Sequence, residues 1–238
     1  MIELNDLYCG YGSGDVLRGI SLQAASGEFL SIAGPNGCGK STLLKAIARL
    51  LPYRGTITIK NKEINSFTEK ELSKNIALLG QISPLYFPYT VYDTVAMGRY
   101  AHSKGWFGSL DKTDRAAVEN ALGTLGLDDL GDALINELSG GQLQRVFLAR
   151  TLAQDPKIIL LDEPTNHLDS KNQITLLDHL AAWVKEGERV IIAVFHDLNL
   201  ALRYSTAAIL MTEGTIAAQG TPAEVFSDPL INTLSEVE

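Results

Sequence analysis

One short segment constrains the fold of this chain more than any other: residues 34–41 read GPNGCGKS. They match the pattern G-x-x-x-x-G-K-[ST] at every fixed position. A short apolar run, Phe29 to Ala33, precedes the segment, and Leu43, Leu44 and Ile47 follow it at helical spacing. The segment therefore connects a buried strand to a helix, which is the context of a phosphate-binding loop.

Such a loop holds phosphate groups with backbone amides, which glycines allow to turn inward, and with the positive end of the following helix. Lys40 is expected to reach the outer phosphates of a nucleotide, and the hydroxyl of Ser41 to bind Mg²⁺. The expected phosphate-contacting residues are Gly34, Pro35, Asn36, Gly37, Cys38, Gly39, Lys40, Ser41 and Thr42. The alternative is a glycine-rich turn that ends in a helix-capping serine. The loop does not identify a reaction, because kinases, GTPases, helicases and transport ATPases share it.

Two further apolar runs, Ile158 to Leu161 and Val190 to Phe195, are nearly continuous, as in parallel strands with both faces covered. A turn and a helical pattern follow each run, which predicts a doubly wound α/β core. Residues 1–30 and about 55–60 contain strand-like pieces and predict a small antiparallel sheet beside this core. Residues of about 84–153 read as mainly helical. The predicted fold class is α/β: a P-loop NTPase core with a parallel sheet, an antiparallel β subdomain and a helical subdomain.

Local signals mark several helix ends. The helix after the loop is expected to include Leu51 and to stop at Pro52. Residues 90–93 and 221–224 each place a threonine three positions before an acidic residue, which is the spacing of a capping box. An apolar stripe from Val118 to Leu125 predicts a helix that ends before glycine 126.

Composition narrows the class of protein. The chain has 238 residues, which suits one large domain or two small subdomains. Its formal net charge of −8 argues against a nucleic-acid-binding protein, which needs a basic surface. No signal-peptide pattern is visible and the apolar runs are too short to cross a bilayer, so we expect any membrane association to be peripheral.

The two cysteines, Cys9 and Cys38, are too few for a disulfide framework, which indicates a reducing compartment. Cys38 lies inside the loop, near a lysine and a helix N-terminus, and both favour the thiolate. We therefore expect alkylation of Cys38 to block nucleotide binding, and Cys38→Ser to retain activity.

The second apolar run ends in two carboxylates, Asp162 and Glu163. Because neighbouring side chains of a strand point to opposite faces, Asp162 would face Mg²⁺ and Glu163 would face an attacking water. This arrangement suits hydrolysis, since one acid holds the metal and the other orients or deprotonates the nucleophile. The alternative is a solvated strand end or a helix cap.

Residues 138–142 read LSGGQ and precede an expected helix. Gly140 and Gly141 expose backbone amides, and Ser139 adds a hydroxyl donor. The segment thus predicts a second anion-binding helix N-terminus. The alternative is a Ser-Gly-Gly loop before a core helix.

These motifs together resemble the ATP-binding cassette (ABC) ATPase family over essentially the whole chain. The loop at 34–41, Gln81, the segment at 138–142, the acidic strand at 158–163, the residues NHLD at 166–169 and His196 occur in the order of that family. The resemblance implies an ATPase that uses ATP and Mg²⁺. It implies a homodimer, or a pair with a second cassette subunit, because the signature of one subunit would cover the ATP held by the loop of the other.

The resemblance also implies roles for single residues. Gln81 would contact Mg²⁺ and the water and couple to the transporter, and His196 would contact the γ-phosphate. Tyr11 would stack on adenine, and Asp169 would lie at the dimer contact. Taken singly, His196 is better explained as a capping or core histidine, and an ordinary turn aromatic is the alternative for Tyr11. The implied catalytic residues are Lys40, Gln81, Glu163 and His196, the metal ligands are Ser41, Gln81 and Asp162, and the nucleotide-contacting signature residues are Ser139, Gly140, Gly141 and Gln142.

The organisation that the resemblance implies is one nucleotide-binding domain over residues 1–238. Residues 1–83 and 154–238 would form the catalytic core with the β subdomain, and residues 84–153 the helical subdomain with the signature. The implied partners are a multi-span membrane permease and an extracytoplasmic substrate-binding protein that acts through the permease, with no nucleic acid. The chain would lie peripherally at the cytoplasmic face of the cell membrane.

Two stretches, residues 92–102 and 196–204, resemble importers of iron-siderophores, haem and vitamin B12. That group often has Pro in place of Ala101 and Asp in place of Thr206; the alternative is a pair of ordinary amphipathic helices. Residues 84–89 gather large apolar side chains between two prolines, so we expect a docking groove for a short helix of the membrane subunit, with buried loop packing as the alternative. Tyr86 and Phe87 would be central to it.

Two other functions compete with transport as readings of this sequence. A GTPase needs the pattern N-K-x-D, whereas residues 61–64 read NKEI and lie too near the loop. An ATP-driven assembly factor or clamp without a transport role stays open at this point, because a single cassette is compatible with it.

Overall fold

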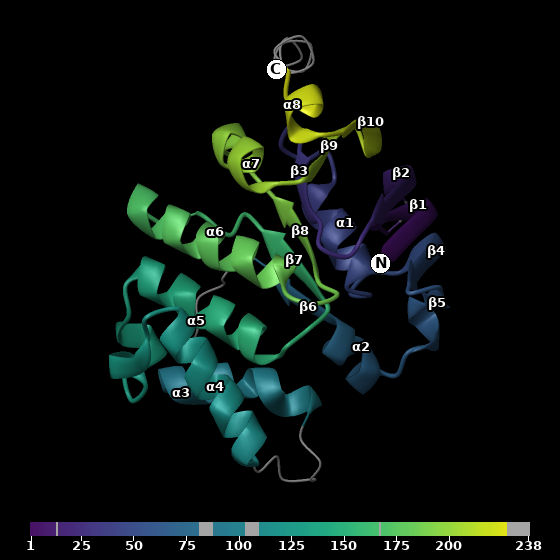
Figure 1. The fold of residues 1–238 in the computed structure, drawn as a ribbon. Coiled ribbons are helices and arrows are strands. Elements are labelled where there is room, and N and C mark those ends of the chain that lie inside the picture. The colour runs from purple at the N-terminus through teal and green to yellow at the C-terminus, as the bar shows by residue number, and fades with distance from the viewer. Residues whose placement is uncertain (13, 81–87, 103–109, 167, 228–238) are drawn as a thin grey trace.

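Parallel strands form the centre of the protein (Figure 1). The computed structural model describes residues 1–12, 14–80, 88–102, 110–166 and 168–227. Six strands form the central sheet in the order β10-β9-β3-β8-β7-β6. They are β3 (Phe29–Ala33), β6 (Ile76–Leu79), β7 (Ile158–Asp162), β8 (Val190–Val194), β9 (Ala207–Thr212) and β10 (Thr215–Gly220). All neighbours pair in parallel except β9 and β10. Strands β3, β7 and β8 confirm the three predicted apolar runs, and every residue in them is buried.

A second, antiparallel sheet confirms the predicted β layer. Its order is β2-β1-β4-β5. The strands are β1 (Ile2–Tyr11), β2 (Gly14–Ala24), β4 (Tyr53–Ile59) and β5 (Lys62–Glu63). Helix α1 (Lys40–Ile47) lies between the two sheets and contacts β1 and β2 on one side and β7 and β8 on the other (Figure 1). The glycine-rich loop therefore opens a helix that is packed on both sides.

Alternation along the central strands divides the interior into two cores. Ile158 and Leu160 of β7 belong to the core that surrounds α1, whereas Ile159 and Leu161 belong to the core under the other helices. Strand β8 alternates in the same way, so its continuous apolar sequence serves two packing surfaces at once.

The remaining helices lie in three groups. Before β6 come η1 (Ile64–Ser66) and α2 (Glu69–Asn75). Between β6 and β7 come α3 (Val91–Ala96), η2 (Met97–Ala101), α4 (Lys112–Thr124), η3 (Asp128–Leu130), η4 (Ile135–Glu137) and α5 (Gly140–Ala153). After β7 come α6 (Ser170–Lys185), α7 (Leu198–Tyr204) and α8 (Pro222–Val225). Helices α3, α4 and α5 pack against one another, as Figure 1 shows at the lower left. The described part of residues 84–153 is thus built mainly of helices and turns.

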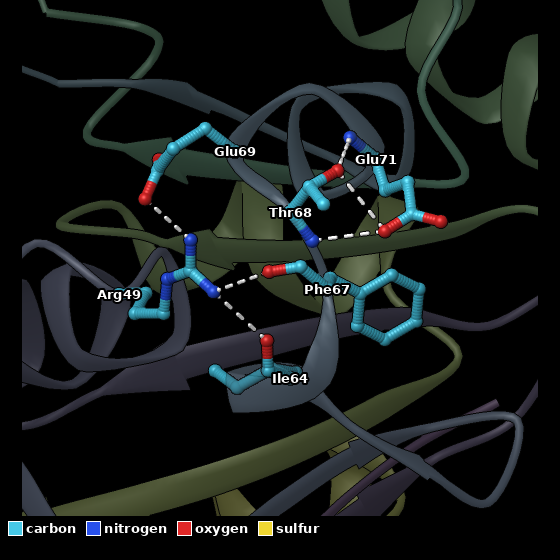
Figure 2. Close-up of polar contacts among 6 residues, drawn as sticks. All are labelled: Arg49, Ile64, Phe67, Thr68, Glu69 and Glu71. Carbon is cyan, nitrogen blue, oxygen red and sulfur yellow. Dashed lines mark hydrogen bonds and ion pairs between the residues drawn. The ribbon is translucent and has the colours of Figure 1, made fainter.

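A polar cluster ties the end of α1 to the segment that leads into β6 (Figure 2). The guanidinium of Arg49 donates to the carbonyl oxygens of Ile64 and Phe67 at 3.1 and 2.9 Å, and it pairs with Glu69 at 2.6 Å. Thr68 caps α2 next to it. One side chain thereby binds two backbone carbonyls and a carboxylate at this connection.

Two local expectations need correction. Helix α1 ends at Ile47, so Leu51 lies outside it, and the chain reverses at Arg49, whose φ is +57°. Thr90 caps α3 by accepting a hydrogen bond from the Asp93 amide, but the Asp93 carboxylate accepts from the Thr90 hydroxyl instead of its amide. The predicted capping box at residues 221–224 is confirmed at α8. Within the described ranges, no helix is long and apolar enough to cross a membrane.

Candidate functional site at the carboxyl edge of the central sheet

Three neighbouring parallel strands bring the sequence motifs together. Strand β8 lies between β3 and β7, and all three run in the same direction. The glycine-rich loop follows β3, Asp162 ends β7, and His196 follows β8 and is exposed. The loop, the acidic pair and the histidine therefore lie at one edge of the sheet, where ligands of open α/β sheets bind.

The loop adopts a conformation that needs glycine at its ends. Gly34 has a φ of +146°, and a Cβ there would lie 2.1 Å from the carbonyl oxygen of Met211. Gly39 is the N-cap of α1 with a φ of +107°, and a Cβ there would lie 2.8 Å from Leu17. The ammonium of Lys40 donates to the carbonyl oxygens of Gly34 and Pro35 at 2.7 and 2.8 Å, so its charge lies inside the loop.

The other loop residues divide into an exposed tip and a buried base. Asn36 and Gly37 are exposed, whereas Thr42 is buried in the first turn of α1. Because helix α1 begins at Lys40, its first amides point toward the space that the loop encloses. The arrangement combines an ammonium, turned backbone amides and a helix N-terminus, which together favour an anion.

Asp162 faces the start of α1. It follows Ile158 and Leu160 on the face of β7 that packs around this helix, and its Oδ1 accepts a hydrogen bond from the Ser41 hydroxyl at 3.1 Å. Burial raises the pKa of Asp162, and the hydrogen bond from Ser41 offsets only part of that rise. The two side chains thus place a carboxylate and a hydroxyl oxygen together beside the loop.

Glu163 points elsewhere, but for a different reason than the predicted strand alternation. Strand β7 ends at Asp162, and Glu163 has a left-handed backbone with a φ of +53°. Its amide donates to the carbonyl of Val194 at 3.2 Å, which ties the turn to the end of β8. Its carboxylate accepts a hydrogen bond from the side chain of Asn166. A turn held by two bonds therefore separates the two acids, because the strand has already ended.

The LSGGQ segment forms the start of α5. Ser139 is the N-cap: its hydroxyl accepts from the Gln142 amide at 3.3 Å, and the Gln142 side chain accepts from the Ser139 amide at 2.9 Å. Ser139 and Gly140 are exposed, so this helix N-terminus faces outward. The predicted helix start is confirmed. The side chains of Ser139 and Gln142 bind each other's backbone amides in this structure.

Two further residues of the proposed nucleotide site lie at the surface. Tyr11 ends β1 and is 54% exposed. Asp169 is the exposed N-cap of α6, where its carboxylate accepts from the Asn172 amide at 2.9 Å and from the Asn172 side chain at 2.8 Å. Asp169 therefore has a structural role in this chain beside the contact that the resemblance implies. Gln81 and the docking residues Tyr86 and Phe87 lie outside the described residues.

Sequence reasoning assigned no role to three groups at this edge. Asn166 belongs to a quoted motif, but nothing in its spacing identified it as the partner of Glu163. The carbonyl of Met211 and the amide of Gly214 contact the loop from β9 and the following turn; the latter donates to Cys38 at 3.1 Å. Backbone groups carry no sequence pattern, so only the fold identifies them.

The expectation of a thiolate at Cys38 is wrong. Only 6% of Cys38 is exposed, and burial raises the pKa of its thiol above the ordinary value although Lys40 and the loop amides act in the opposite direction. Desolvation of the charged form outweighs a nearby ammonium that is itself bonded to carbonyls. The Cys38 side chain is therefore a protonated, buried thiol at neutral pH.

Comparison with known proteins agrees with this site. The sequence pattern of the family described as ABC transporter matches residues 17–166. The ferric enterobactin transport ATP-binding protein FepC of Escherichia coli is 41% identical over 96% of this chain and 84% of that protein. The achromobactin transport ATP-binding protein CbrD of Dickeya dadantii is 38% identical over 100% of this chain and 88% of that protein.

A solved structure is similar as well. The ATP-binding cassette MJ0796, described as a dimer in a post-hydrolysis state bound to ADP and Pi, superimposes with a TM-score of 0.81. It is 30% identical and covers 93% of this chain and 99% of its own. The chain therefore belongs to the ABC transporter family, as one of its ATP-binding, ATP-hydrolysing proteins.

Proposed function

We propose that this chain powers the import of an iron-siderophore, haem or cobalamin type of substrate by binding and hydrolysing ATP on a membrane permease. The name of FepC, a ferric enterobactin transport ATP-binding protein, supports a ferric cargo for the proposal. One observation carries the proposal for the reaction: the Ser41 hydroxyl meets the Asp162 carboxylate at 3.1 Å beside the loop, while the neighbouring carboxylate of Glu163 is bonded to Asn166 instead.

The residues at this point fit Mg²⁺. A hydroxyl and a carboxylate offer hard oxygen donors, and their contact with the phosphate loop suits an ion that binds few protein ligands and substrate phosphates. We assign Ser41 and Asp162 as ligands, with Gln81 as the third. When bound, the ion would neutralise charge that develops on the phosphates.

The chain's own residues divide the work on ATP. Lys40 and the amides of residues 34–42 hold the phosphates, and Tyr11 stacks on the adenine. Glu163 acts as the general base toward water, and its hydrogen bond from Asn166 orients the carboxylate. His196, exposed at the end of β8, contacts the γ-phosphate.

The proposed active unit is a homodimer or a pair with a second cassette. The exposed helix N-terminus at residues 139–142 would complete the nucleotide site of the partner, and Asp169 would lie at the contact between the two. The dimer described for MJ0796 supports this arrangement. Residues 1–83 and 154–238 would form the core and 84–153 a helical subdomain. The dimer would lie at the cytoplasmic face of the membrane, under a permease served by an extracytoplasmic binding protein.

Nucleotide-dependent melting and hydrolysis test the site. The wild-type chain should hydrolyse ATP only with Mg²⁺, and Mg²⁺ should strengthen the thermal stabilisation by ATP. Asp162→Asn should abolish that Mg²⁺-dependent increment while ATP alone still binds. A variant that kept the increment would show that Asp162 does not hold the metal.

Uptake of iron-labelled siderophore by cells that express the chain with its permease tests the cargo. Glu163→Gln in the same cells is the matched control, because it should still assemble with the permease but hydrolyse ATP far more slowly. Equal uptake by both would contradict a role in powering transport.

A further inference from the structure

Three residues of the stretch 92–102 contact the same end of one helix. Gly98, Arg99 and His102 all meet backbone atoms at the C-terminus of α5, the helix whose N-terminus carries Ser139. Residues 92–102 carry one of the two importer-like sequence stretches, but none of them belongs to the proposed nucleotide site. The inference rests on the proposed role of Ser139.

Gly98 allows the closest approach. A Cβ at this position would lie 2.3 Å from the carbonyl oxygen of Arg150 and 3.1 Å from the amide of Gln154. Any larger residue would push η2 away from the last turn of α5. The backbone of η2 is therefore in direct contact with that turn.

Arg99 binds the end of α5 with a buried charge. Only 6% of Arg99 is exposed. Its Nη1 donates to the carbonyl of Ala153 at 2.8 Å, and its Nε donates to Oδ1 of Asp114 in α4 at 2.9 Å. The carbonyls at a helix C-terminus carry partial negative charge and lack partners within the helix, so a guanidinium is the favoured occupant.

His102 and the C-cap residue extend the contact to the core. Nε2 of His102 lies 2.9 Å from the carbonyl of Gln154, and because a carbonyl only accepts, the nitrogen must carry the proton. The side chain of Gln154 donates to the carbonyl of Ser73 in α2 and to that of Ile76 at the start of β6. Residues 98–102, the end of α5 and the start of β6 thus form one hydrogen-bonded unit.

A cleft lies next to this unit. A cavity of about 520 Å³ lies between α4 and α6 and is lined by Arg99, Asp155, Trp183 and Arg189 among others. The polar contacts of Arg99 and His102 thus lie beside a cleft on this side of the end of α5.

We propose that Arg99 and His102 are positioning residues for α5, which set where Ser139 stands relative to the nucleotide of the partner. Helix α5 has 14 residues and is therefore about 20 Å long. A rigid helix held at its C-terminus carries any tilt of that end to Ser139 at the other. Residues 98–102, which follow the proposed docking residues 84–89 in the chain, are thereby connected through α5 to Ser139 at the proposed dimer contact.

Arg99→Lys in the full-length chain tests the proposal. Lysine keeps the charge opposite Asp114 but cannot donate to Asp114 and Ala153 at once with a planar fork. We expect ATP binding to the phosphate loop to be unchanged and kcat to fall about tenfold, the factor that corresponds to about 1.4 kcal/mol. Hydrogen exchange should also quicken in peptides that cover residues 138–143, at the far end of the helix.

His102 provides a graded second variant. His102→Ala removes the donor to Gln154 and should lower kcat less than Arg99→Lys does. His102→Gln restores a donor and should recover most of the loss, which a merely space-filling role would not predict.

The matched control is Arg49→Lys, because Arg49 also binds backbone carbonyls and a carboxylate, but between α1 and α2 and, among the described residues, without a bond to α5. It should leave kcat and exchange at residues 138–143 unchanged.

The outcomes separate this inference from the proposed function. A wild-type chain that did not hydrolyse ATP would overturn the proposed function itself. With an active wild type, the inference is overturned if Arg99→Lys keeps its kcat, if it loses ATP binding in proportion, or if exchange quickens only around residues 97–102 and 150–156. A fall in kcat with intact binding and faster distal exchange supports it.

Discussion

The Ser41 hydroxyl lies 3.1 Å from Oδ1 of Asp162, although 121 positions separate them in the chain. One residue opens the helix after β3 and the other ends β7, and the strand between them is β8. The pairing depends on parallel strands whose carboxyl ends share an edge. It puts two of the three proposed metal ligands within one hydrogen bond of each other.

Glu163→Gln should bind ATP but hydrolyse it about 10²–10⁴ times more slowly, since glutamine keeps the shape but cannot act as a base. Loss of the negative charge near the γ-phosphate should also favour the closed state. Light scattering with and without ATP should therefore show a doubling of mass.

The control for this experiment is the double variant with Ser139→Arg. A bulky side chain at the exposed N-cap of α5 should prevent closure and return the monomer. If Glu163→Gln hydrolysed ATP normally, or stayed monomeric with ATP bound, both the base assignment and the two-subunit site would be wrong.

Cys38 should react slowly with iodoacetamide at neutral pH. Burial raises the pKa of its thiol, so the reactive thiolate forms only at higher pH than for an ordinary cysteine, and the rate should climb as pH rises beyond the usual thiol range. ATP should protect, and Cys38→Ser should remove this reaction while ATP binding persists. Mass mapping separates it from Cys9, which is also buried. Fast alkylation of Cys38 at pH 7 would contradict the burial argument.

Gly214→Ala should weaken ATP binding. The Gly214 amide donates to the loop carbonyl of Cys38 at 3.1 Å, and a Cβ at its φ of +79° would lie 1.9 Å from the carbonyl oxygen of Val16. Displacing this turn releases one hydrogen bond on the phosphate loop, so the Kd for ATP should rise roughly tenfold. Titration with a fluorescent ATP analogue measures the change.

Gly187→Ala is the matched control. Its φ is +68°, but a Cβ there meets no atom within 4 Å, so it shares the backbone strain without the collision. It should cost about 1–2 kcal/mol of unfolding free energy and leave the Kd unchanged. Equal effects of both variants on the Kd for ATP would show that the hydrogen bond from Gly214 to Cys38 does not stabilise the phosphate loop for ATP binding.

Asp114→Asn should lower the unfolding free energy at neutral pH by about 3–5 kcal/mol, because it leaves the buried guanidinium of Arg99 without its charged partner. Burial alone would raise the pKa of Asp114, but the hydrogen bond and charge of Arg99 and the Asp111 amide lower it overall. A carboxylate with a lowered folded pKa stabilises the fold above its unfolded pKa, and this contribution disappears as pH falls through the folded value.

Urea unfolding from pH 7 downward should therefore show the two chains converge below about pH 4, where the unfolded carboxylate is protonated. Glu186→Gln, at the exposed partner of Arg189, should change the unfolding free energy by less than about 1 kcal/mol. A wild-type advantage that stayed constant down to pH 2 would contradict the role of the ionised Asp114.

The sequence alone determined the elements that rest on local pattern. Residues 29–47 predicted a strand, a turn and a helix in that order because an apolar run, a glycine-rich loop and helical periodicity follow one another in one short stretch. Ser139 was recognisable as a helix N-terminus for the same reason. The order of the motifs then identified the family and, with it, the proposed residues of the site.

Only the tertiary structure decided what depends on distant backbone and on burial. Glu163 is separated from Asp162 by a left-handed turn bonded to β8, and strand alternation plays no part in it. Cys38 is shielded by packing that no local charge pattern reveals. Arg99 reaches a carbonyl 54 residues away because α3 and η2 pack on α5. Side-chain periodicity is a property of neighbouring residues, whereas desolvation and carbonyl partners are settled only when segments far apart in the chain meet.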